Sequence, residues 1–162
     1  MRRRFVCGGL PLAAVIAVAS CTDDVGPTVT ERFVADLSAA NEVSPTVDPV
    51  AFPATGKAEF EILESIPGIF FKVSVTGINN VTASHIHGPA STSQTAGVLS
   101  NLYTGAATGS GITGVLAQGV INSASGITFD SLLALLRNGQ AYVNVHTTTN
   151  AGGDIRGQIV KQ

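Results

Sequence analysis

Apolar residues alternate with polar ones along most of this chain, which is typical of strands that bury one face. The clearest case is residues 56–63, where every second residue is apolar and the residues between are mostly charged. Residues 69–76 repeat the alternation after Pro67-Gly68, a pair that favours a tight turn because Pro fixes φ and Gly accepts a positive φ. The two segments therefore predict an antiparallel hairpin.

Six further segments have strand-like patterns: residues 32–37, 81–87, 98–103, 112–121, 140–147 and 153–160. Turn signals rich in Gly, Pro, Asn and Ser separate most of them. Only residues 128–137 have a helical period, with Leu132, Leu135 and Leu136 on one face and Asn138-Gly139 as the terminator. These patterns predict an all-β fold, an antiparallel Greek-key-like sandwich or barrel with one short helix.

The first twenty residues have the pattern of an export signal. Arg2-Arg3-Arg4 precedes an apolar run, Phe5 to Val18, that is too short to span a bilayer comfortably. The following Ala19-Ser20-Cys21 resembles the lipobox of bacterial lipoproteins, in which the Cys is lipidated and becomes the mature N-terminus. An ordinary secretory signal with an incidental Cys is the alternative.

The chain is accordingly expected to have three parts: a lipoprotein-type signal peptide (1–20), a tether (21–30) and one domain (31–162). A length of 162 residues suits one domain with a hydrophobic core. Lipid on Cys21 would anchor the exported domain to a membrane, facing the periplasm or the cell exterior. With Cys7 removed and Cys21 lipidated, no thiol remains for a disulfide or a catalytic nucleophile.

The charge of the chain argues against nucleic acids as partners. Only 12% of the residues are charged, and without the three N-terminal arginines six basic residues face eleven acidic ones. An acidic domain without a basic cluster lacks the electrostatic surface that nucleic acids require. We therefore expect no nucleic-acid binding.

The candidate chemistry lies in three histidines. His85 and His87 are one residue apart in a predicted strand, so their side chains point to the same face. His146 lies in a later strand, on the face opposite two valines. All three are predicted on the outer faces of their strands, away from the core, and they converge if these strands are neighbours. Three imidazoles suit copper or zinc.

A structural role for these side chains is the alternative. Imidazoles beside a Gly-rich turn can hold the following loop by hydrogen bonds, and Asn144 would suit this role too. Glu59 and Glu61 are interpreted as a solvated strand face, and Asp154 with Arg156 as a surface pair. The sequence has no nucleophile elbow, phosphate-binding loop or HExxH motif, so no catalytic residue is predicted.

Several motifs together resemble the CHRD (chordin) domain. They are Phe33–Ser38, Ala40–Val43, His85–Ala90, Leu132–Gly139, Tyr142–Thr147 and Gly152–Ile159. The resemblance covers about residues 31–161. It implies an all-β extracellular module, found in the developmental antagonist chordin and in many bacterial secreted proteins, and it implies no settled activity for the bacterial members.

The order of the histidines also resembles that of Cu/Zn superoxide dismutases, in which a His-x-His pair and a late His supply three copper ligands. The departures are large: a bridging histidine, zinc ligands and a disulfide are missing, and the active-site arginine does not align. The resemblance thus implies a reduced, copper-only or vestigial site and not a complete dismutase.

Two functions are consistent with these observations. The favoured one is a non-catalytic, lipid-anchored, extracytoplasmic CHRD-type binding or structural module, which would meet a protein or cell-envelope partner through the loops after His87 and around Gly105. The alternative is a copper or zinc protein with its metal at His85, His87 and His146, serving metal handling or redox chemistry.

Overall fold

The computed structural model describes residues 27–43 and 46–162. The predicted signal peptide, Cys21 and most of the predicted tether lie outside these residues. The elements are β1 (Val29–Ser38), η1 (Ala39–Asn41, a 3-10 turn), β2 (Thr55–Leu63), β3 (Ile69–Ile78), β4 (Val81–His87), β5 (Val98–Thr104), β6 (Ile112–Ile121), α1 (Phe129–Arg137), β7 (Tyr142–Thr147), β8 (Ile155–Gln158) and β9 (Val160–Lys161). Because β1 begins at Val29, the end of the predicted tether belongs to the first strand.

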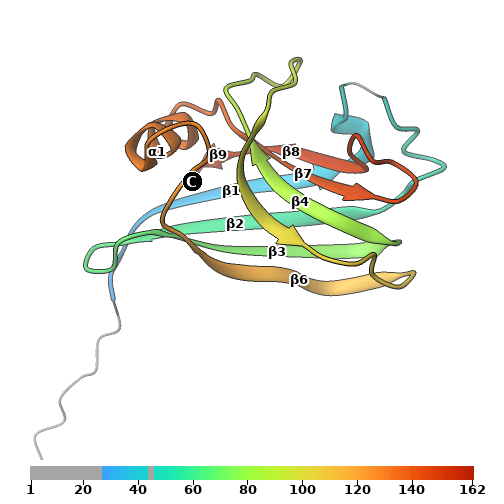
Figure 1. The fold of residues 1–162 in the computed structure, drawn as a ribbon, viewed down its shortest axis with the longest axis horizontal. Helices are drawn as coiled ribbons and strands as arrows, with labels where there is room; N and C mark the ends of the chain where they lie inside the picture. The colour runs from blue at the N-terminus through green and yellow to red at the C-terminus, as the bar shows by residue number, and fades with distance from the viewer. Residues whose placement is uncertain (1–26, 44–45) are drawn as a thin grey trace, which may run out of the picture.

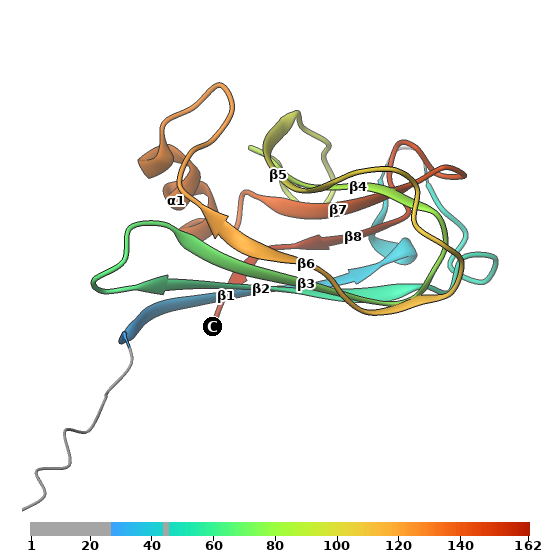
Figure 2. The same ribbon diagram turned by 60° about the horizontal axis from the view of Figure 1, so that its bottom comes forward.

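The strands form one antiparallel sheet that curls into a nearly closed barrel (Figure 1). Its strand order is β5-β4-β7-β8-β1-β2-β3-β6, and β9 also pairs with β1. Figure 2 shows the two sides of the barrel, with β4, β7 and β8 above β1, β2, β3 and β6. The predicted all-β antiparallel class with one short helix is confirmed.

The predicted hairpin is also confirmed. Ile62 of β2 pairs with Ile69 of β3, and Gly68 in the turn between them has φ +130°, which side chains rarely adopt. On the outer side of the hairpin Glu59 forms an ion pair with Lys72, 2.6 Å away, and both side chains are exposed. The alternation of the sequence therefore gives one buried and one solvated face, as predicted for these residues.

The core fills the inside of the barrel, and α1 packs at one end. Thr128 caps the helix by accepting a hydrogen bond from the backbone N–H of Ser131, 3.1 Å away. Leu132 and Leu136 of the helix are fully buried. Each such side chain contributes about 1.5–3 kcal/mol to folding. They belong to one core cluster with apolar residues that include Phe33, Leu37, Phe60, Ile69, Val73, Ile86, Val143, Val145, Ile155 and Ile159.

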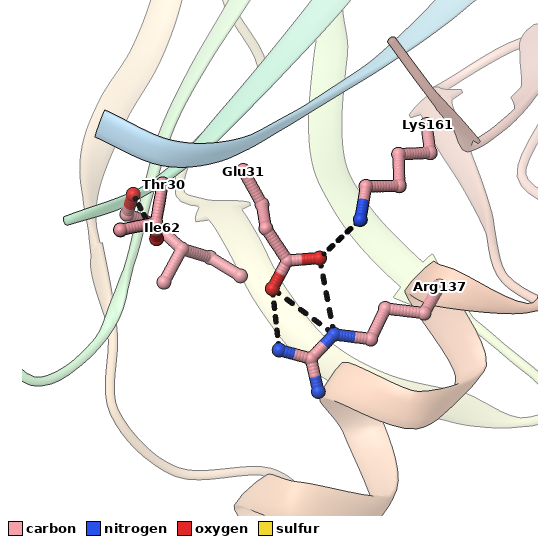
Figure 3. A network of polar contacts seen from close by, with 5 residues as sticks. All are labelled: Thr30, Glu31, Ile62, Arg137 and Lys161. Atoms are coloured by element: carbon pink, nitrogen blue, oxygen red, sulfur yellow. Dashed lines mark hydrogen bonds and ion pairs between the residues drawn. The ribbon is translucent and has the colours of Figure 1, made fainter. Parts of the chain in front are cut away.

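An ion-pair network joins the first strand, the last strand and the end of the helix (Figure 3). Glu31 of β1 accepts hydrogen bonds from the Arg137 guanidinium at the end of α1 and from Lys161 of β9. The bond from Lys161 is 2.7 Å long. Hydrogen bonds from Arg137 and then Lys161 lower the pKa of Glu31 to about 2.

Among the described residues, no helix is long and apolar enough to cross a membrane.

Candidate metal centre

The three histidines come together because β4 and β7 are neighbours in the sheet. His85 is paired with Asn144, and Ala83 with His146, in an antiparallel ladder. Alternate residues of both strands therefore share the outer face of the barrel. One possible ligand atom from each of His85, His87 and His146 lies within 4.8 Å of the others. The three histidines thus converge, as the sequence predicted for the case that their strands are neighbours.

This outer face is not open to solvent. His87 and His146 are only 8% and 9% exposed, and His85 is half-buried. Ile86 between the first two histidines is fully buried in the core, so the predicted alternation holds. The histidines lie away from the apolar core as predicted, but the loops after β4 and β7 pack over two of them.

One ring nitrogen of His87 and one of His146 hold these loops. His87 Nδ1 lies 3.0 Å from the carbonyl oxygen of Ala96, and His146 Nδ1 lies 3.1 Å from that of Ala151. A carbonyl only accepts, so each Nδ1 carries the proton and donates it. The structural role considered from the sequence is thus filled by Nδ1, and Nε2 of both rings is left with a free lone pair.

His87 Nε2 is buried without any hydrogen-bond partner among the described residues. Buried polar atoms in proteins almost always have one. His85 Nδ1 lies 3.1 Å from His146 Nε2, so these two nitrogens also face each other. Nε2 of His87, Nε2 of His146 and Nδ1 of His85 form a set of three nitrogen donors.

This donor set fits a transition metal. When three nitrogens bind one zinc or copper ion at about 2.0–2.1 Å, they lie about 3.3–3.6 Å from one another. One nitrogen from each of the three rings lies within 4.8 Å of the others, so shifts on the order of one ångström bring the rings around one ion. Backbone carbonyls already hold the second nitrogen of two rings, as is usual for metal-binding histidines.

Electrostatics keep the imidazoles in the state that binds metal. Burial, with repulsion from His146 and then His87, lowers the pKa of His85 to about 4. Burial also lowers the pKa of His87 and of His146, although the carbonyls of Ala96 and Ala151 act in the opposite sense. All three rings are therefore neutral at pH 7, and a metal ion need not displace a proton from them.

Arg156 is a buried support for this centre and not part of the predicted surface pair. It is 2% exposed, and its Nη2 donates to the carbonyls of Ser91 and Gln94, at 3.0 and 2.8 Å. Its guanidinium carbon lies 3.6 Å from the ring centre of Tyr142. Tyr142 in turn stacks on His87, with ring centres 5.0 Å apart and planes 9° apart. Arg156 therefore fixes both a neighbour of His87 and the loop that carries Ala96.

The predicted surface pair is wrong for Asp154 as well. Its side chain is 4% exposed and accepts a hydrogen bond from Asn150. Burial raises the pKa of Asp154, and the Asn150 hydrogen bond acts against this rise. The error has a simple cause, since charge alone suggested exposure while loop residues distant in sequence cover this part of the strand.

Glu42 is a buried acid that the sequence did not single out. It is 8% exposed, and burial raises its pKa to about 7, against the attraction of Arg156. Asn144 Nδ2 lies 3.4 Å from Glu42 Oε2, while Glu42 Oε1 and Asn144 Oδ1 have no partner among the described residues. Gly153 makes room for this contact, because a Cβ there would lie 2.3 Å from Asn144 Nδ2.

Comparison with known proteins gives one match. The family model of the CHRD domain matches residues 33–159, a region that contains the three histidines, Glu42 and Arg156. No curated protein and no solved structure matches the chain. On the extent of the matched region, this chain belongs to the CHRD domain family.

Proposed function

We propose that this protein is an exported, lipid-anchored CHRD module that binds one copper or zinc ion through His85, His87 and His146. The observation that carries the proposal is the buried Nε2 of His87, which has no hydrogen-bond partner in the part of the chain that the structure describes and belongs to a cluster of three imidazoles. A bound metal would satisfy this atom. The module then acts by binding and not by catalysis, a role that a CHRD domain fits.

The geometry favours the metal site over a purely structural role for the histidines. Loop-holding needs one nitrogen per ring, and the Nδ1 atoms of His87 and His146 fill that role. A structural role alone gives no reason to bury the second nitrogen of His87 without a partner, which costs about 1–3 kcal/mol. Metal binding together with loop-holding accounts for both nitrogens of His87 and of His146.

Calorimetry of the full chain in detergent tests the metal proposal, with Zn(II) or Cu(II) as the titrant at pH 7.5. We expect one ion per chain and loss of binding in His87→Ala. Gln118→Ala, an exposed change on β6, which contributes none of the three histidines, is the matched control and should bind as the wild type does. Wild-type protein that takes up neither zinc nor copper, with copper tried as both Cu(II) and Cu(I), would refute the proposal, and so would a folded His87→Ala variant with unchanged affinity.

The anchor is supported by the charged, apolar and lipobox-like pattern that ends at Cys21. Lipid on this residue would hold the domain at a membrane on its periplasmic or outer side. In a bacterial host, Cys21→Ser should move the protein from the membrane to the soluble fraction, and Cys7→Ser should not. Mass spectrometry of the mature protein gives an independent readout, because lipidation adds acyl mass to a chain that begins at Cys21.

A further inference from the structure

The donor set of the proposed site carries no charge. Its three atoms are nitrogens of neutral imidazoles, and the cluster contains no carboxylate or thiolate among the described residues. The second nitrogens of His87 and His146 donate to the carbonyls of Ala96 and Ala151, where many metal sites have a carboxylate. Neither the ligands nor these hydrogen-bond partners neutralise a bound cation.

The fixed charges nearby do not neutralise it either. The nearest stacked cation is Arg156, which is buried and contacts Tyr142 beside His87. Glu42 is engaged with Asn144 and attracted by Arg156, and Asp154 is bonded to Asn150. The positive group thus lies against the ring that supports a ligand, while each of the two acids is hydrogen-bonded to an asparagine and neither belongs to the cluster of possible ligands.

Resting on the proposed metal function, we infer that the site prefers monovalent Cu(I) over Cu(II) and Zn(II). The cost of removing an ion from water grows with the square of its charge, so a divalent ion costs about four times as much as a monovalent one. That cost is offset poorly where no anion is present. Cu(I) also accepts three nitrogen ligands without a fourth, anionic one.

This preference has a measurable redox consequence. A site that binds Cu(I) more tightly than Cu(II) raises the reduction potential of bound copper above that of the free ion, provided that both forms bind at the same three nitrogens. For this one-electron couple, each tenfold change in the ratio of the two dissociation constants corresponds to 59 mV. The potential therefore reports the preference independently of either affinity alone.

The test is competition of the full chain in detergent against chelators of known affinity. Cu(I) is titrated anaerobically against bicinchoninate, and Cu(II) and Zn(II) are titrated against chelators of their own. We expect a dissociation constant for Cu(I) at least tenfold below that of either divalent ion. A smaller or reversed difference overturns the inference but leaves the metal function intact. A chain that binds none of the three ions overturns both the inference and the proposed metal function.

A variant tests the electrostatic cause. Asn144→Asp, made together with Glu42→Gln so that no second carboxyl group contacts the new one, places a carboxylate opposite His85 on the same face, and it should reduce the preference for Cu(I) at least tenfold. Gln118→Glu adds the same charge at an exposed position of β6, outside the strands that carry the histidines, and should leave the ratio unchanged. An unchanged ratio in the folded double variant overturns the charge argument. Should this variant fail to fold, the wild-type ratio and potential decide.

Discussion

Nδ1 of His85 and Nε2 of His146 lie 3.1 Å apart, although 61 residues separate them in the chain. Two lone pairs repel at this distance, so one proton is shared between the rings when they hold no metal. Since Nδ1 of His146 already donates to Ala151, this proton belongs to His85. A metal ion that binds both nitrogens takes the place of that hydrogen bond, and the proton then moves to Nε2 of His85, so that the ring stays neutral.

The first prediction concerns the pH dependence of metal binding. Ordinary histidines lose metal as they are protonated below a pKa near 6.5. Here burial lowers the pKa of all three rings, and that of His85 to about 4. Cu(I) affinity should therefore change little between pH 7.5 and 6 and fall as the pH approaches 4. A tenfold loss for each pH unit starting at 6.5 would contradict the buried, neutral state of the rings.

The second prediction is that Glu42→Gln stabilises the protein only at high pH. The pKa of Glu42 is raised from 4.5 to about 7, so its contribution to stability is complete below pH 4.5 and is lost as the pH rises through 7. Gln cannot ionise and keeps an oxygen for the Asn144 amide. Urea unfolding should show the variant more stable than wild type by on the order of 2 kcal/mol at pH 8, with little difference at pH 4.5.

Comparing the two proteins at each pH removes the effect of the histidines. Their pKa values are lowered in the folded state, so their protonation destabilises the fold as pH falls from 6.5 towards 4. This effect has the opposite sign to that of Glu42 and is common to both proteins. An equal stability difference at both pH values would argue against a buried acid at position 42.

The third prediction concerns the network in Figure 3. Glu31→Gln should lower the free energy of unfolding by about 1 kcal/mol at pH 7, and less in high salt. Because the pKa of Glu31 is lowered from 4.5 to about 2, this difference is present above pH 4.5 and disappears as pH falls towards 2. Glu59→Gln is the control, since its side chain is 40% exposed against 14% for Glu31. Equal effects of the two changes would refute the special role of Glu31.

The fourth prediction compares two glycines with positive φ. Gly153 has φ +139°, and a Cβ there would meet Asn144 at 2.3 Å and Glu42 at 2.6 Å. Gly77 has φ +68° and open space around the same position. Gly77→Ala should cost about 1–2 kcal/mol for backbone strain alone, and Gly153→Ala clearly more. Chemical unfolding of both variants measures the difference, and equal losses would exclude close packing under Asn144.

Strand periodicity was enough to predict which side chains share a face. In β4 and β7 the alternation placed the three histidines opposite the apolar residues, and the structure agrees. A period of two residues depends only on local geometry, so it can be recognised without knowing the fold. The adjacency of β4 and β7 depends on the topology of the whole sheet, and the sequence left it open.

Local sequence patterns could not predict the residues that surround the three histidines. Glu42 meets Asn144 across 102 residues of chain, and Arg156 reaches the carbonyls of Ser91 and Gln94 across 65 and 62 residues. A single charged residue in a strand is usually solvated, so nothing local distinguishes a buried arginine from an exposed one. Burial here depends on a loop that folds back over the strand and on the ring of Tyr142.

The stacking of Tyr142 on His87 gives the protein an intrinsic optical probe. The chain has no tryptophan and two tyrosines, of which Tyr103 lies on β5 and Tyr142 stacks directly on a proposed ligand. Copper bound to the His87 imidazole would quench the Tyr142 emission, while Tyr103 supplies a background signal. Occupancy of the centre can thus be followed in the unlabelled protein by ultraviolet fluorescence.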